Sequence, residues 1–158
     1  MREMRRKERQ LSRQRALEVL KNCEYGMLAT VNEDGTPYCV PVSPVLMGER
    51  IYFHCAPEGH KLENLLRQPR VCFTCVGRTQ LQPQNFTTFF ESAVVFGRAR
   101  MVEEREEKVE ALLEICRKFA AENMANAPKA IEASLPRTGI CCIEIQEISG
   151  KSKGYLEK

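Results

Sequence analysis

The chain has 158 residues, of which 43% are hydrophobic and 28% are charged. This balance is typical of a folded domain and excludes disordered, collagen-like and repeat proteins. No apolar run approaches the roughly 18 residues of a membrane span, and the basic N-terminus lacks the apolar stretch of a secretory signal. We therefore expect a single cytoplasmic domain over residues 1–158, with a basic arm at 1–10 and a polar tail at 150–158.

The net charge of +3 is unevenly distributed along the chain. Residues 1–15 carry seven basic and two acidic side chains, whereas the remaining residues carry 17 basic and 19 acidic ones. A basic arm can bind nucleic acid or an anionic membrane. Because no aromatic residue is interleaved with these charges, we favour a solvated lead-in to a helix and expect neither nucleic acid nor a membrane as a partner.

Eight cysteines raise the question of disulfides or a zinc site. In a reducing compartment disulfides are not expected. Cys72 and Cys75 form a C-x-x-C motif within a stretch that reads as a strand. Residues three apart on a strand face opposite sides, so the two sulfurs cannot converge on one metal ion. We therefore expect no metal site and interpret most of the thiols as small buried hydrophobes.

The first half of the chain predicts a helix followed by short strands. Helical spacing of apolar residues indicates a helix from Leu11 to Asn22. The strands expected next are Met27–Asn32, Tyr38–Val45 and Arg50–Cys55, joined by turns at Glu33-Asp34-Gly35 and Met47-Gly48-Glu49. Prolines lack the donor that a strand ladder needs, so the strand that contains them is expected to face an opening, an edge or a ligand; they are Pro37, Pro41 and Pro44.

The second half predicts two helices and three strands. The helices are Glu58–Arg67, ended by Pro69, and an amphipathic one at Glu103–Asn123. A loop or a short turn of helix is expected at Asn126–Arg137. The strands are Arg70–Gly77, Phe86–Val102 and Gly139–Ile148. Six antiparallel strands with few helices predict a small closed barrel with the helices outside it.

The candidate binding and catalytic residues are concentrated between Tyr52 and Lys61, a segment that includes both histidines, His54 and His60. A strand leads here through a turn into a helix that begins Gly59-His60-Lys61. Backbone N–H groups at a helix start favour an anion, and a lysine with a chargeable histidine strengthens that preference for a phosphate. The pattern thus indicates a phosphate site, and the alternative is a solvent-exposed lysine and histidine at a helix start.

Three stretches resemble the FMN-binding split barrels, the relatives of pyridoxamine 5′-phosphate oxidase; they are Ala29–Val42, Ile51–Leu65 and Pro69–Phe73. Within that superfamily the chain is most similar to the nitroimidazole-resistance-type nitroreductases, and the matching positions are Arg5-Arg6, Pro37–Pro41, Tyr52–Lys61 and Ser92–Gly97. The likeness covers nearly the whole chain, and its most specific part is the segment from Tyr52 to Lys61.

The resemblance implies a mainly β fold with peripheral helices, a six-stranded antiparallel Greek-key split barrel. It also implies a homodimer that binds FMN in a cleft between the subunits. Carried over by position, His60 and Lys61 hold the phosphate, and Ser92 lies near the flavin ring. The full set of implied cofactor-binding residues is Val40, Pro41, Val42, Phe53, His54, Cys55, His60, Lys61 and Ser92, with some contacts made by backbone groups.

Some positions depart from the oxidase pattern. The oxidases have an arginine near the position of Val40 and another at that of His60, so fewer charges are available here for a phosphate. They also carry a C-terminal signature with tryptophan and arginine. This chain has no tryptophan and contains Gly-Lys-Ser-Lys-Gly-Tyr from Gly150 to Tyr155. Oxidation of pyridoxamine phosphate is therefore not expected.

The implied function is an FMN-dependent oxidoreductase that uses a nicotinamide donor to reduce a small electron-poor acceptor, such as a nitro compound. The alternative is a flavin- or haem-binding barrel without turnover. The candidate catalytic residue is His54, which on its strand shares a face with Tyr52, opposite the apolar Phe53 and Cys55. It is predicted to face the cleft or a partner subunit, where imidazole can donate a proton. The alternative is a packed strand histidine.

Overall fold

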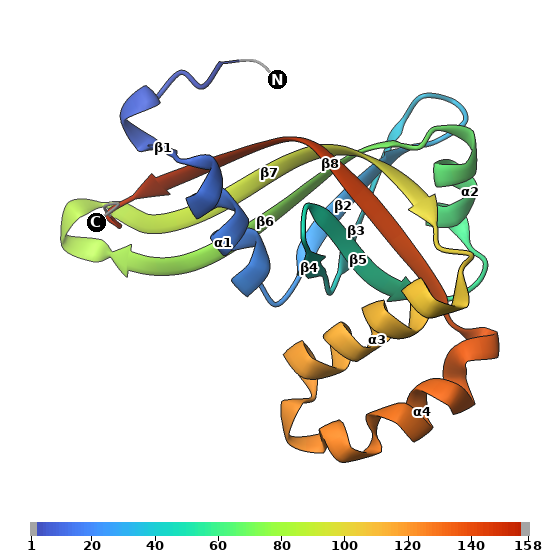
Figure 1. The fold of residues 1–158 in the computed structure, drawn as a ribbon. Coiled ribbons are helices and arrows are strands. Elements are labelled where there is room, and N and C mark those ends of the chain that lie inside the picture. Colours follow the sequence, from blue (N-terminus) through green and yellow to red (C-terminus); the bar gives the residue numbers. More distant parts are fainter. Residues whose placement is uncertain (1–2, 156–158) are drawn as a thin grey trace.

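The computed structural model describes residues 3–155 and has an antiparallel sheet as its main element (Figure 1). The strand order is β3-β2-β6-β7-β8-β5-β4, and β1 pairs with the far part of β8. The strands are β1 (Gln10–Leu11), β2 (Gly26–Val31), β3 (Pro37–Val42), β4 (Val45–Met47), β5 (Arg50–Cys55), β6 (Arg70–Gln82), β7 (Thr87–Met101) and β8 (Gly139–Lys153).

Four α-helices flank this sheet; they are α1 (Arg13–Asn22), α2 (His60–Arg67), α3 (Arg105–Phe119) and α4 (Ala127–Ser134). Figure 1 shows α1 lying across β6, β7 and β8, while α3 and α4 form a separate pair beside β4 and β5. Among residues 3–155, no helix has both the length and the apolar character needed to cross a membrane.

Two hydrophobic clusters hold the fold together. The first lies inside the curled sheet and joins α1 and α2 to the inward-facing residues of the strands, with Phe53, Phe73 and Val95 fully buried. The second lies between the other side of β5 and β8 and the α3–α4 pair, and it includes Tyr52, Ile140 and Leu112. Strand β5 therefore contributes alternate residues to each cluster, as the period of two in a strand requires.

The proline-containing strand lies at an edge, as predicted. β3 is the last strand of the path and pairs with β2 alone among the described strands. The turn before it forms where expected, because Gly35 adopts a φ of +84° and the Asp34 carboxylate accepts a hydrogen bond of 3.0 Å from the Thr36 amide. The prediction that Cys72 and Cys75 face opposite sides of their strand is also confirmed. Cys75 is buried in the first cluster, whereas Cys72 lies on the opposite face of β6.

Several predicted features differ in the structure. The split-barrel fold is confirmed, but the barrel is not closed, and two short strands, β1 and β4, were not anticipated. The first helix begins after Ser12, whose side chain caps it by accepting a hydrogen bond from the Arg15 amide. β8 continues to Lys153, so part of the predicted polar tail is strand. Arg2 of the basic arm and residues 156–158 of the tail lie outside the described residues.

Candidate functional site

Two strand edges without partners border the opening of the barrel. One is the outer edge of β3, which carries Val40, Pro41 and Val42. The other is the last part of β5, because β4 begins at Val45, opposite Tyr52, and leaves residues 53–55 paired with β8 alone among the described strands. The three-residue step from Val42 to Val45 spans at most about 11 Å, which keeps these two edges close together.

The side chains on these edges point in different directions. Phe53 and Cys55 are buried in the first cluster, and Val40 and Val42 pack against it, so their contacts with a ligand in the opening would be largely through backbone groups. Pro41 is exposed. His54 is exposed as well, on the face opposite Phe53 and Cys55, which is the orientation predicted from its strand position.

The neighbour of His54 on this face is structural. Tyr52 is buried in the second cluster, and its hydroxyl donates a hydrogen bond of 2.7 Å to Glu107 of α3. Burial raises the pKa of Tyr52, and the bond to Glu107 adds to the rise. Arg100 donates to the same carboxylate and holds the pKa of Glu107 below its ordinary value. This cluster anchors α3 behind β5 and leaves His54 as the accessible side chain at the end of that strand.

The start of α2 follows directly after this edge. Gly59 adopts a φ of +127° there, a conformation that favours glycine, and the helix has no side-chain cap. The Leu62 amide donates to the Gly59 carbonyl at 2.8 Å, so the N–H groups of His60 and Lys61 are the ones that remain available to an anion. His60 and Lys61 are the first two residues of the helix, which agrees with the predicted helix start.

His60 is held by a polar network that the sequence did not reveal. Its Nε2 atom lies 2.8 Å from Oδ1 of Asn32, and its ring centroid lies 4.0 Å from that of Tyr38 on β3. The amide of Asn64, which is buried, donates to the same Oδ1 at 2.8 Å and to Thr30 at 3.0 Å. Because a carbonyl oxygen only accepts, Nε2 carries the proton and Nδ1 remains for another contact.

This network borders a small open hollow, which we call the α2 hollow. Its volume is about 380 Å³, and it is lined by Asn32, Glu33, Asp34, His60, Glu63, Asn64 and Arg67. The sequence feature that points to this network is Asn64, a polar residue between Leu62 and Leu65 on the buried face of the helix. A buried amide needs partners, but the sequence does not say which residues supply them.

Lys61 lies on a different side of the helix start. Burial raises the pKa of the Cys55 thiol, and the nearby Lys61 ammonium partly offsets that rise. Lys61 therefore lies toward the end of β5, whereas His60 lies toward β2 and β3. The two cationic candidates bracket the first turn of α2 and the adjacent strand edges.

Ser92 is separated from the other predicted residues. It lies on β7, where it pairs with Val76 of β6 and Lys151 of β8. His54 pairs with Ile140, eleven residues away along β8, which corresponds to roughly 36 Å of extended strand. Across the sheet, the part of β7 next to Ser92 is separated from Val42 of β3 by three strand spacings, or about 14 Å. Within one chain, Ser92 does not join the group around α2.

Comparison with known proteins gives the family. Residues 12–152 match the model of the family described as pyridoxamine 5′-phosphate oxidase, and the chain therefore belongs to this family. A comparison with curated proteins found no match.

Solved structures share the fold. A candidate 5-nitroimidazole antibiotic resistance protein from Bacteroides thetaiotaomicron is 24% identical, with a TM-score of 0.76 over 90% of this chain and 86% of that chain. An FAD-binding protein from Mesorhizobium loti is 23% identical, with a TM-score of 0.65 over 92% and 98%. The flavocytochrome Anf3 from Azotobacter vinelandii is 19% identical, with a TM-score of 0.70 over 99% and 75%.

Proposed function

We propose that this protein is an FMN-dependent oxidoreductase that uses a nicotinamide donor to reduce a small electron-poor acceptor, with nitro compounds as the favoured class. The observation that carries the proposal is the group of anion-binding features at the start of α2. An uncapped helix terminus, His60 and Lys61 lie beside two unpaired strand edges, in a chain of the pyridoxamine 5′-phosphate oxidase family. These donors fit the phosphate of FMN.

Each part of the site has a distinct role in this proposal. Lys61 and the first amides of α2 bind the phosphate, and His60, fixed through Nε2, adds a donor at Nδ1 when it is protonated. The free backbone edges of Val40–Val42 and of residues 53–55 offer donors and acceptors to the flavin ring. When bound, FMN would supply two-electron chemistry, in which a hydride from NAD(P)H and one proton from solvent together provide the two electrons and two protons that the acceptor receives.

Pyridoxamine phosphate is not the proposed substrate. The chain contains no tryptophan, and the segment from Gly150 to Tyr155 lacks the tryptophan- and arginine-containing signature of the oxidases. The likeness to the nitroimidazole resistance protein favours a nitro compound instead.

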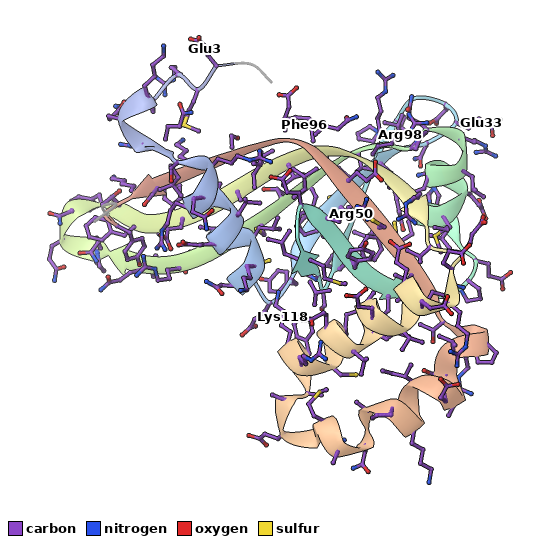
Figure 2. All side chains as sticks on the ribbon, viewed as in Figure 1. Glu3, Glu33, Arg50, Phe96, Arg98 and Lys118 are labelled. Atoms are coloured by element: carbon purple, nitrogen blue, oxygen red, sulfur yellow. The ribbon has the colours of Figure 1, made fainter. Side chains whose placement is uncertain are left out.

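A homodimer is part of the proposal. One face of the sheet, which we call the outer face, carries alternate residues of β2, β6 and β7 that point away from the first cluster. Exposed apolar side chains on it are Met27, Val31, Val76 and Phe96. Figure 2 shows Phe96 and Arg98 on the side of the sheet away from α1. Such a patch is typical of a self-association surface.

The position of Ser92 gives a second argument for the dimer. Ser92 belongs to the outer face and lies far from the α2 group of its own chain. A second copy seated on this face can bring its own Ser92 to the flavin. Sedimentation should show a dimer that Phe96→Glu dissociates, with loss of bound FMN. A monomer that retains FMN would rule out a site between subunits.

The first experiment is the absorbance spectrum of the purified protein, followed by anaerobic addition of NADH or NADPH and then of a nitroarene. Flavin bands that bleach with the donor and recover with the nitroarene are expected. Protein that neither carries FMN nor takes it up would contradict the proposal. A flavin that the donor does not bleach would favour a second candidate, a non-catalytic flavin- or haem-binding barrel, which the likeness to a flavocytochrome supports.

His54 is the proposed proton donor to the acceptor, because its side chain is exposed at the unpaired end of β5. We expect His54→Ala to retain FMN and its reduction by the donor, and to slow acceptor reduction about 100-fold, the lower end for a general acid. Stopped-flow measurement of the two half-reactions separates these effects. An unchanged oxidative half-reaction would show that His54 is not the proton donor.

A further inference from the structure

A second cavity lies beside α1, away from the α2 group. This α1 cavity has a volume of about 630 Å³, within the range of small-molecule sites. It is bounded by the last turns of α1, the loop that follows, the start of β2 and the part of β6 after Thr74. The side chains that line it include Arg15, Glu18, Val19, Tyr25, Met27, Val76, Arg78 and Glu91.

The strand pairing explains why the cavity is open. β2 begins at Gly26, opposite Cys75, so β6 beyond Cys75 pairs with β7 alone among the described strands. A side chain at Gly26 is excluded, because a Cβ atom there would lie 2.2 Å from the ring of Phe73. The open edge of β6 and the end of α1 thus enclose a space that no neighbouring strand fills.

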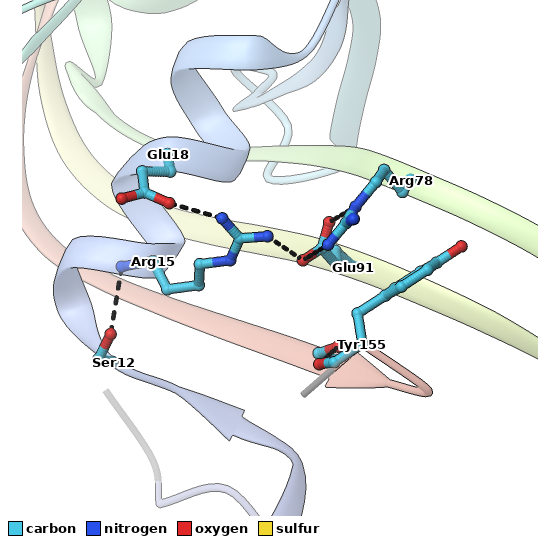
Figure 3. A network of polar contacts seen from close by, with 7 residues as sticks. Ser12, Arg15, Glu18, Arg78, Glu91 and Tyr155 are labelled. Atoms are coloured by element: carbon cyan, nitrogen blue, oxygen red, sulfur yellow. Dashed lines mark hydrogen bonds and ion pairs between the residues drawn. The ribbon is translucent and has the colours of Figure 1, made fainter. Parts of the chain in front are cut away.

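The charged side chains of the cavity neutralise one another. Arg15 donates to Glu18 at 2.6 Å and to Glu91 at 2.8 Å, and Arg78 donates to Glu91 at 2.8 Å (Figure 3). The side chain of Glu91 is only 4% exposed. The hydrogen bond from Arg78, supported by Arg15, holds the pKa of this carboxyl below its ordinary value.

These pairs determine which ligands the cavity can accept. Two arginines face two glutamates, and the exposed Glu24 adds a further acid at the wall. No net positive charge remains for an anion. The apolar wall is formed by Val19, Met27 and Val76, and the exposed ring of Tyr25 offers a stacking surface. An uncharged planar ring is therefore the best match.

The cavity also offers donors to such a ring. A guanidinium has five N–H groups, and the bonds described above leave some of them unused on both Arg15 and Arg78. Figure 3 shows the two guanidinium groups converging on Glu91, which fixes their orientation. An uncharged oxygen, such as that of a nitro or carboxamide group, can accept from these donors without bringing a net charge into the cavity.

Strand register places the cavity next to residues assigned to the flavin. Val76, in the cavity wall, pairs directly with Ser92. Met27, also in the wall, pairs with Pro41 of β3 and with Thr74. All of these residues lie on the outer face, where the proposed partner subunit brings its flavin. Glu91 and Arg15 face α1 on the opposite side of the strands, so the cavity reaches the outer face only at the unpaired edge of β6, where Val76 and Met27 line it.

We infer that the α1 cavity is the binding site of the electron acceptor, and that it selects an uncharged planar aromatic compound with a nitro or carbonyl oxygen. The inference rests on the proposed function. It assigns the acceptor to the subunit that supplies Ser92, while the phosphate is held by α2 of the other subunit.

The test uses FMN-loaded protein and two probes of nearly the same shape, uncharged 4-nitrobenzamide and anionic 4-nitrobenzoate. Equilibrium dialysis measures binding to the oxidised protein, and steady-state kinetics give KM. We expect wild-type protein to bind the amide at least tenfold more tightly than the carboxylate. Val76→Trp, which fills the cavity, should weaken amide binding and raise its KM at least tenfold, in protein that sedimentation and absorbance show to be dimeric and loaded with FMN.

The matched control is Leu81→Trp, because Leu81 is exposed on the same strand but does not line the cavity. It should behave as wild type. Tyr25→Ala, which removes the stacking surface, provides a second variant if Val76→Trp disturbs the dimer, and it should also weaken amide binding.

Normal amide binding in both cavity variants would overturn the inference while leaving the proposed function intact. Equal binding of amide and carboxylate would overturn the charge argument. Wild-type protein without flavin, or with a flavin that no donor reduces, would instead contradict the proposed function.

Discussion

The α2 hollow and the α1 cavity both contain charged side chains, but they use those charges in different ways. In the α2 hollow, uncharged amides hold a single histidine at a helix start, and an unpaired lysine lies on the other side of the same turn. In the α1 cavity, two arginines are each bound to acids, and no net positive charge is left. The acids Glu33, Asp34 and Glu63 line the α2 hollow itself, so a phosphate fits only on the Lys61 side of the helix start, toward Cys55, whereas the α1 cavity suits an uncharged ring.

The comparison shows that arginine or lysine content alone does not define an anion site. What matters is whether the cation already has an acidic partner within the fold. Glu91 is buried where it accepts from both Arg15 and Arg78, so those guanidinium groups are already neutralised. Lys61 has no such partner among the described residues, and its charge remains available to a ligand.

The largest expected effect is at Lys61. Lys61→Ala should weaken FMN binding by about 1.5–3 kcal/mol, or roughly 10- to 150-fold, because a charge-assisted hydrogen bond to the phosphate is lost. Riboflavin, which lacks the phosphate, should bind as before. Fluorescence titration of both ligands measures the difference.

The control for Lys61 is Arg67→Ala, at the other end of α2, where Arg67 pairs with Glu33 at 3.2 Å. It should leave both affinities unchanged. Equal losses of FMN and riboflavin in Lys61→Ala would mean that Lys61 does not act on the phosphate.

The paired charges of the α1 cavity should affect stability rather than flavin binding. Glu91→Gln should lower the free energy of unfolding by about 1–2 kcal/mol, since hydrogen bonds from two arginines are weakened and solvent screens the half-exposed Arg78. Glu18→Gln, in a more exposed pair, should cost about 0.5 kcal/mol or less. Urea unfolding measures both values.

The pH dependence gives a sharper version of this prediction. The pKa of Glu91 is lower in the folded protein than its ordinary value of 4.5. Its stabilising effect is therefore present in full above pH 4.5 and lost as the pH falls through the folded-state pKa. The difference between wild type and Glu91→Gln should stay constant near neutral pH and close below pH 4.5. A difference independent of pH would show that the carboxylate charge is not involved.

The smallest effect is expected from the network behind His60. Asn32→Ala removes the acceptor that fixes Nε2 and should weaken FMN binding by about 0.5–1.5 kcal/mol, without changing riboflavin binding. Asn32→Asp keeps an acceptor oxygen but gives His60 an acidic partner, so it should not restore the FMN affinity. Titration with FMN tests both variants. Identical FMN affinities in wild type and Asn32→Ala would exclude a positioning role for Asn32.

The sequence determined the local parts of this protein. The turn at Met47-Gly48-Glu49 and the apolar stretch after it predicted β5, and Asp34-Gly35 predicted the turn before β3, because turn geometry depends on near neighbours. Gly59, His60 and Lys61 are consecutive, so a helix beginning there necessarily brings them to one terminus. The orientation of His54 followed from the period of two along a strand.

Only the tertiary structure decided which distant residues meet. Nothing local indicates that Asn32 holds His60, or that Glu91 gathers Arg15 and Arg78. The separation of Ser92 from the α2 group follows from the register of β7 and β8, which depends on long-range pairing and a bulge near Gly97. The barrel is open because β3 and β4, the two ends of the strand path, do not pair with each other among the described strands. Strand ends and registers are fixed by packing across the whole sheet, and that packing is not encoded in any single segment.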